Sequence, residues 1–115
     1  MAGAWLGGQK SVLLMQSSGV GNLVNVLGMV QVCRFPLVMI ITMRGEQGEF
    51  NPWQVPMGRA TPQVLGAMGV RVRRASDAKE VAPLVGAAFK DEQATAVLVS
   101  QAVIGIKSFQ EQRSR

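Results

Sequence analysis

Short apolar runs alternate along the chain with longer segments in which apolar residues recur at helical spacing. Four segments have the length of strands: the apolar runs 11–15, 36–43 and 95–100, and residues 70–75, which include three arginines. Three segments at helical spacing are residues 22–33, 61–69 and 78–90. Strands that alternate with helices predict an α/β fold, in which a doubly wound, mostly parallel sheet carries helices on both faces.

Turn-forming residues set the expected boundaries of these elements. Thr61 is predicted to cap a helix with Pro62 in its first turn, so residues 44–60 are expected to form a long loop. Asp77 is predicted to cap the next helix, from which Pro83 separates a short first piece. The helix at 22–33 is apolar around most of its circumference and is expected to be covered on more than one side.

The carboxyl ends of parallel strands meet at one edge of a sheet, where ligands of such folds bind. Four loop starts are therefore expected together: residues 16–22, 44–54, 74–76 and 100–101. Polar residues concentrate in the first two of these loops. The sequence thus places a candidate site at this edge.

Composition limits the chemistry of the chain. Its 115 residues allow one domain, and with no histidine the chain has neither a His-based triad nor a His-ligated zinc site of its own. Cys33 is the single cysteine, which suits a reducing cytoplasm, and its apolar helical setting predicts a buried structural thiol. No apolar run approaches the roughly 20 residues of a membrane span. The start of the chain lacks the pattern of a signal peptide.

The net charge is +5, but the basic residues are scattered. Arg71, Arg73 and Arg74 form the main cluster, within a predicted strand. They are expected on the solvated side of an edge-like strand, since no nucleic-acid-binding signature accompanies them. The charge therefore indicates a small anionic ligand rather than nucleic acid.

The turn between the first strand and helix, "QSSGVGN", has several interpretations. It is not a dinucleotide fingerprint, because Val24 stands where a third glycine or alanine is needed, and no lysine follows as in a phosphate loop. The helix N-terminus still offers free N–H groups to an anion, which leaves an independent small-anion site open. The alternative is a tight turn without a ligand, capped by Ser18 or Asn22.

The loop after the second strand, "RGEQGEFNPWQVPMGR", carries more charge. Arg44 and Arg59 have the chemistry to clamp an anion by bidentate hydrogen bonds. Glu46 and Glu49 are either acid–base partners or members of a structural ion-pair network with these arginines. Trp53 is either the wall of a pocket or an anchor in the core.

Together, "VLLMQSSGVGNLVNVL" and "FPLVMIITMRGEQGEFNPWQVPMGRATPQVLGAMGV" resemble the pyrimidine-binding (Pyr) domain of thiamine-diphosphate-dependent 2-oxoacid decarboxylases of the sulfopyruvate and phosphonopyruvate type. The resemblance covers residues 2–100. It implies thiamine diphosphate with magnesium, a PP-domain beta subunit that carries the magnesium site, and a 2-oxoacid substrate with a second anionic group. It also implies two sets of site residues. Those on the cofactor side are Gln16, Ser17, Ser18, Gly19, Gly21 and Asn22, and those on the substrate side are Arg44, Glu46, Gln54 and Arg59.

The same resemblance indicates that the chain is a single, partial Pyr-type domain, truncated at its N-terminus, with residues 105–115 as a loose tail. The glutamate that activates the cofactor in the family precedes the "AGAWLGG" segment and is absent, and its role does not pass to Glu46 or Glu49. The chain alone is expected to be inactive and to form a homo-oligomer, because Val12 and Leu14 lack cover. The alternative function is a non-catalytic oligomeric remnant of the fold that binds no cofactor.

Overall fold

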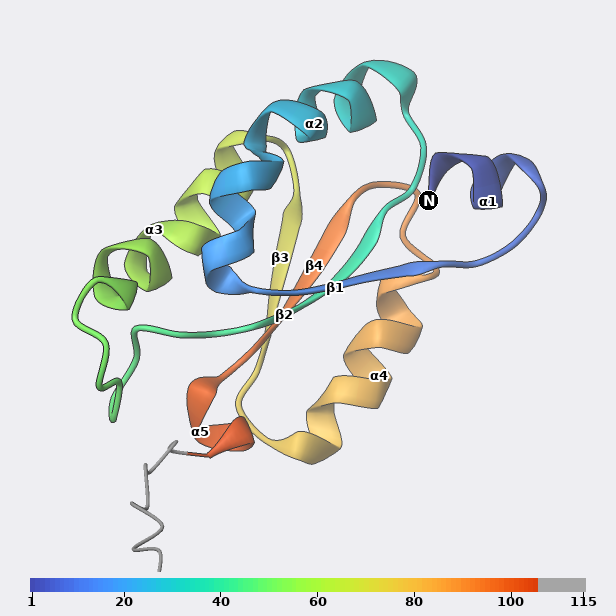
Figure 1. The fold of residues 1–115 in the computed structure, drawn as a ribbon. Helices are drawn as coiled ribbons and strands as arrows, with labels where there is room; N and C mark the ends of the chain where they lie inside the picture. Colours follow the sequence, from blue (N-terminus) through green and yellow to red (C-terminus); the bar gives the residue numbers. More distant parts are fainter. Residues whose placement is uncertain (106–115) are drawn as a thin grey trace, which may run out of the picture.

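The computed structural model describes residues 1–105, and these form one layered α/β unit (Figure 1). The strands are β1 (Val12–Gln16), β2 (Val38–Thr42), β3 (Arg71–Ala75) and β4 (Thr95–Val99). The helices are α1 (Ala2–Leu6), the 3-10 turn η1 (Ser17–Gly19), α2 (Val20–Cys33), α3 (Gln54–Ala67), α4 (Ala78–Ala88) and α5 (Gln101–Ile104). The predicted fold class is confirmed. The predicted tail lies almost entirely outside the described residues.

All the strands are parallel, in the order β1-β2-β4-β3. The central strand β4 is buried along its whole length, because sheet neighbours flank it and helices cover both of its faces. The edge strand β3 carries exposed Arg71 and Arg74, as the sequence predicts, but Arg73 is half-buried, because it pairs with Asp91.

Two apolar clusters hold the layers together. The larger lies between the sheet and the helices α2 and α3, where Leu27 and Leu65 meet Met39, Ile41 and Leu98. The smaller lies under α4 on the opposite face and includes Val38, Ala88 and Val97. Helices on both faces of a parallel sheet thus bury its strands, as the near-continuous apolar runs predict.

The helix α3 begins earlier than predicted. It starts at Gln54, so the loop after β2 ends at Trp53, and Thr61 and Pro62 lie inside the helix. The Thr61 hydroxyl donates to the Met57 carbonyl at 2.7 Å instead of capping a helix end. Pro56 lies in the first turn, where a backbone N–H has no partner within the helix, so the missing N–H of this proline costs no hydrogen bond.

Two other helices also differ from expectation. Neither Ser18 nor Asn22 caps α2; Gly19 is its N-cap residue, and no side chain bonds to the free N–H groups there. The helix α4 is continuous through Pro83, so this proline does not separate a first piece. Asp77 caps α4 as predicted, through a bond from the Lys79 N–H at 2.8 Å and a reciprocal contact of Glu80.

The outer side of α2 is uncovered within residues 1–105, contrary to the expectation of cover on more than one side. Val26, Met29 and Val32 are 46%, 51% and 83% exposed, because only the side that faces the sheet and α3 is packed. Cys33, at the end of this helix, is exposed as well, so the prediction of a buried thiol is wrong. Val32, next to Cys33 in the sequence, belongs to the same exposed surface, whereas Val30 and Phe35 are buried.

Candidate functional site

The four strand ends meet at the carboxyl edge of the sheet, as predicted. The Arg44 N–H, after β2, donates to the buried hydroxyl oxygen of Ser17, after β1, at 3.0 Å. Arg74, near the end of β3, and Gln101, after β4, both reach the same loop after β2. The loop that follows β2 therefore contacts the ends of the other three strands.

Glu49 is the most enclosed charged group of that loop. Its side chain is 1% exposed and forms a bidentate ion pair with Arg44, at 2.6 and 2.7 Å. It also accepts bonds from the N–H groups of Gly45 and Asn51 and from the side chain of Gln101, each at 3.0–3.1 Å. The bond from Arg44, with these further donors, holds the pKa of Glu49 far below its usual range despite burial. Glu49 is therefore a fixed anion at neutral pH.

Glu46 connects the loop after β2 to the ends of β3 and β4. Its carboxylate accepts bonds from Arg74 at 2.6 Å, from the Gln101 N–H at 2.9 Å and from the Ser100 hydroxyl at 3.1 Å. Burial opposes its charge, but these bonds outweigh burial, so the pKa of Glu46 is below its usual value. With both carboxylates held ionised by arginines, Glu46 and Glu49 belong to an ion-pair network, and the acid–base alternative is not supported.

Backbone packing fixes the position of this loop on α3. Gly45 has a positive φ of 76°, and a Cβ there would overlap the Gln54 carbonyl. A Cβ at Gly58, in α3, would overlap the carbonyl oxygen of Arg44. The loop therefore lies directly on the helix, an approach that only glycine at both positions permits.

The predicted cofactor-side residues lie at the start of α2 and just before it. Gln16, Gly21 and Asn22 are exposed, Ser18 and Gly19 are partly exposed, and Ser17 is buried under Arg44. A Cβ at Gly21 would meet only the Met57 sulfur, at 4.0 Å. This turn is thus an open surface on which a ligand can lie against the backbone.

The predicted substrate-side residues are less closely grouped. Arg44 and Glu46 belong to the ion-pair network, and Gln54 and Arg59 lie in the first two turns of α3, with Arg59 exposed. The Arg44 guanidinium also lies over the ring of Phe50, at 5.6 Å. Trp53 is 71% exposed, so its alternative role as a core anchor is wrong.

A small cavity of about 150 Å³ opens at this edge, between the ends of β1 and β2, the loop after β2 and α5. Gln16, Arg44, Phe50, Gln101 and Ile104 are among its lining residues. The first two were predicted as site residues, whereas Gln101 was expected only within the loop start at residues 100–101; its side chain bonds both to Glu49 and to the Glu46 N–H. The position of Gln101 directly after a strand, at the same edge, was the signal that pointed to it.

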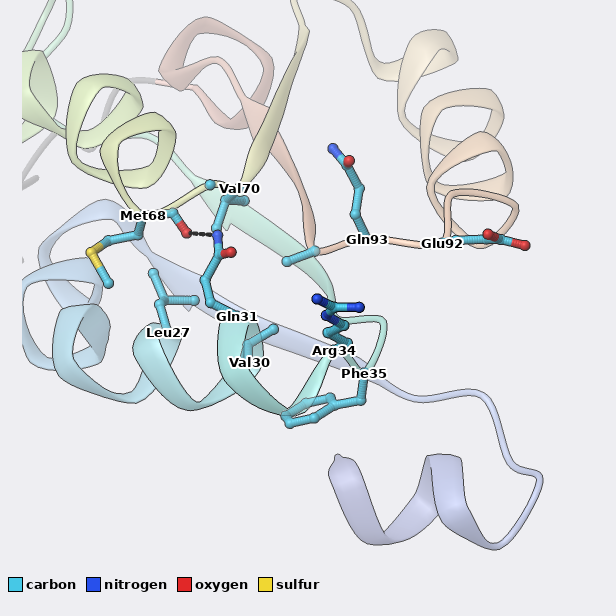
Figure 2. A pocket seen from close by; sticks show the side chains of 11 residues that line it. Leu27, Val30, Gln31, Arg34, Phe35, Met68, Val70, Glu92 and Gln93 are labelled. Atoms are coloured by element: carbon cyan, nitrogen blue, oxygen red, sulfur yellow. Dashed lines mark hydrogen bonds between the residues drawn. The ribbon is translucent and has the colours of Figure 1, made fainter.

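A second cavity, of about 180 Å³, lies at the opposite end of the sheet (Figure 2). It is enclosed by the last turns of α2 and α3 and by the segment before β4. Figure 2 shows the Gln31 amide directed at the Met68 carbonyl, to which it donates a hydrogen bond. None of the predicted site residues lines this cavity, so the carboxyl edge remains the candidate site.

The described residues contain no cluster of metal-binding side chains, and none of their helices is long and apolar enough to cross a membrane.

Comparison with known proteins identifies relatives of the chain. It is 39% identical over 103 residues to the sulfopyruvate decarboxylase subunit alpha of Methanothermobacter thermautotrophicus, a match that covers 85% of this chain and 62% of the relative. It is 47% identical over 64 residues to the subunit of the same name from Methanococcus maripaludis, covering 55% of this chain and 38% of the relative. Phosphonopyruvate decarboxylase of Streptomyces viridochromogenes is 44% identical over 66 residues, covering 56% of this chain and 17% of the relative.

No protein-family model matches the chain. The chain spans less than two thirds of the length of each of these relatives. The resemblance expected from the two loop segments is nevertheless confirmed.

Proposed function

Because the chain is homologous to a region shared by sulfopyruvate and phosphonopyruvate decarboxylases, we propose that it is the Pyr-type component of a thiamine-diphosphate-dependent decarboxylase. Its substrate is a 2-oxoacid with a second anionic group, a sulfonate or a phosphonate. It acts with a PP-domain beta subunit and is inactive without it. The observation that carries this proposal is the 39% identity to an alpha subunit along 85% of the chain.

The open turn at the start of α2 fits one side of the cofactor. Gln16, Ser18 and Asn22 offer neutral hydrogen-bonding groups, and Gly21 leaves room for a planar ring against the backbone. When bound, thiamine diphosphate supplies a nucleophilic carbon for attack on the 2-oxo group. The residues of this chain orient the ring, and magnesium and the diphosphate are assigned to the partner domain.

The arginines of the second loop and of α3 account for the anionic substrate. Arg44 uses Nε and Nη2 to bind Glu49, so its Nη1 is the nitrogen that it presents to a ligand. Arg59 is exposed and offers a complete guanidinium fork. Glu46 and Gln54, the other proposed substrate-side residues, lie in the same loop and in the first turn of α3.

Reconstitution with a partner tests this function. The chain is mixed with the beta subunit of a sulfopyruvate decarboxylase, thiamine diphosphate and MgCl₂. Complex formation is measured by light scattering and cofactor binding by calorimetry. We expect a complex and saturable cofactor binding. The absence of both a complex and saturable binding would refute the proposal.

Site variants sharpen this experiment. Asn22→Ala is expected to weaken cofactor binding about tenfold, as loss of one hydrogen bond does. Its matched control is Asn25→Ala, since Asn25 is exposed on the same helix but is not among the proposed site residues. Arg59→Gln is expected to weaken binding of the dianionic substrate. Equal effects of the two asparagine variants would remove Asn22 from the site.

A non-catalytic, oligomeric domain is the second candidate function. It is favoured by the internal ion pairs of Arg44 and Glu46, which account for both side chains without a ligand. Under this alternative, the reconstitution assay detects only background complex formation and cofactor binding. Arg44→Ala and Asn22→Ala then alter stability and nothing else that the assay measures.

A further inference from the structure

The cavity at the amino ends of the strands is built from segments that the fold brings together (Figure 2). It holds about 180 Å³, and its lining residues all lie between Leu27 and Ala94 in the sequence. Much of its wall is apolar, and Leu27, Val30, Phe35 and Val70 of this wall are buried. An engineered apolar cavity of about 150 Å³ binds benzene, so this cavity has room for a group of about that size.

Arg34, at the rim of this cavity, is a cation without a partner in the part of the chain that the structure describes. Residues 1–105 contain six arginines, and four of them form ion pairs with carboxylates. The fifth, Arg59, lies in the first two turns of α3. The guanidinium of Arg34 forms no hydrogen bond or ion pair within residues 1–105, which leaves its donors available to a ligand.

The backbone of Arg34 supports a role for its side chain. Arg34 follows α2 as its C-cap residue with a φ of 53°, and within residues 1–105 it is the only residue other than glycine with a positive φ. Glycine is the usual residue in this left-handed conformation, because a Cβ makes the conformation less favourable. A glycine would relieve this strain, so what an arginine adds at this position is its side chain.

The other polar groups around the cavity do not neutralise Arg34. Glu92 is the other charged residue of the lining, but Figure 2 shows its carboxylate directed away from Arg34, and the two form no ion pair. The Gln31 amide donates to the Met68 carbonyl, so this acceptor at the end of α3 is occupied. The rim therefore offers a guanidinium beside an apolar wall.

We propose that this cavity binds a small monocarboxylate that carries a compact apolar group, such as a single ring or a branched chain. The apolar group fills the space against Leu27 and Val70, and the carboxylate accepts two parallel hydrogen bonds from Arg34. The apolar wall disfavours a ligand with further polar groups, because those groups would lose water without gaining partners. The site lies at the opposite end of the sheet from the carboxyl edge and does not rest on the proposed function.

Nuclear magnetic resonance titration of the nitrogen-15-labelled, 115-residue chain with benzoate tests this site. Benzamide is the uncharged probe of the same shape. We expect benzoate to shift the backbone N–H signals of Val70 and Ala94 saturably, and benzamide to bind at least about tenfold more weakly, because it lacks the charge that pairs with Arg34. The absence of a saturable shift up to about 20 mM benzoate, or equal affinity for the two probes, would overturn the proposal.

Arginine variants locate the carboxylate. Arg34→Gln should remove the preference for benzoate and leave benzamide binding unchanged. Arg59→Gln is the matched control, since Arg59 is also exposed and without an ion pair among residues 1–105, and it should keep the preference. A preference that survives Arg34→Gln, or that is lost in Arg59→Gln, would show that the anion binds elsewhere, and the proposal is then wrong.

A cavity variant locates the apolar group. Ala94→Leu adds bulk to a lining residue and should weaken the binding of both probes at least about tenfold, because the added atoms take up space in the cavity. Unchanged binding by a folded Ala94→Leu chain would place the ring outside the cavity and refute the proposal. Circular dichroism checks the fold of each variant. If Ala94→Leu does not fold, the comparison of the two exposed arginines decides by itself.

Discussion

Replacing Glu49 by glutamine should destabilise the fold more than any other single charge removal at the carboxyl edge. Glu49 accepts five hydrogen bonds in a site where its side chain is 1% exposed, two of them from Arg44. Glutamine keeps one acceptor oxygen but places an NH₂ group where the other oxygen accepts. Breaking a buried ion pair from one side costs about 3–5 kcal/mol. With one oxygen retained, we expect Glu49→Gln to lower the free energy of unfolding by about 3 kcal/mol at pH 7.

The dependence of this loss on pH provides a second test. The pKa of Glu49 is lower in the folded chain than in the unfolded chain, where it has its ordinary value of about 4.5. The charged group therefore adds stability above that pH, and its contribution is lost as the pH falls toward the folded value. The difference between the wild type and Glu49→Gln should be largest at pH 7 and should narrow between about pH 5 and pH 3.

Urea unfolding followed by tryptophan fluorescence measures both quantities. The matched control is Glu92→Gln, because Glu92 is exposed, and its unfolding free energy should change by less than about 0.5 kcal/mol. A loss below about 1 kcal/mol for Glu49→Gln at pH 7 would show that the network contributes little. A difference from wild type that stays constant down to pH 3 would show that the charge of Glu49 is not the cause.

Three other predictions address the helices and the thiol. Asp77→Ala should lower the free energy of unfolding by about 1 kcal/mol in the same urea assay, through loss of the cap of α4, and no change would mean that the cap contributes nothing. Gly58→Ala should lower the free energy of unfolding by more than about 3 kcal/mol, because its Cβ would overlap backbone atoms. Gly66→Ala, in the same helix, meets open space and should stabilise the chain slightly. Equal urea midpoints for the two variants would contradict this packing. Cys33 should react with a thiol reagent in the native state, one thiol per chain, and protection until denaturant is added would contradict its exposure.

Most of the fold could be predicted because apolar residues recur along the chain with the spacing of strands and helices. The runs that became β2 and β4 are bounded by polar or turn residues, and Asp77 marks the start of α4. The start of α3 could not be read in the same way, because Pro56 and Pro62 offer two first-turn positions and the sequence does not rank them. The choice depends on the contact between Gly58 and the Arg44 carbonyl, which is tertiary.

The meeting of the four loop starts at one edge was predicted, but the pairing of their side chains was not. Parallel strand order places the four loop starts at one edge, so Arg44 and Glu46 were expected there. Their partners depend on the order of strands across the sheet: β4 lies next to β2, which brings Gln101 to Glu46 and Glu49. The exposure of Cys33 was missed for a related reason, because an apolar neighbourhood in sequence does not reveal which side of a helix is packed.

Four segments that are far apart in the sequence are joined at the carboxyl edge by bonds among six residues: Ser17, Arg44, Glu46, Glu49, Arg74 and Gln101. Folding itself therefore removes the conformational entropy of the loop after β2. A ligand that binds at this edge meets a preorganised surface and has little loop ordering to perform, which leaves more of its contact energy as affinity. Loosening the network by Glu49→Gln should thus weaken binding through a less favourable binding entropy, even where the substituted side chain does not touch the ligand.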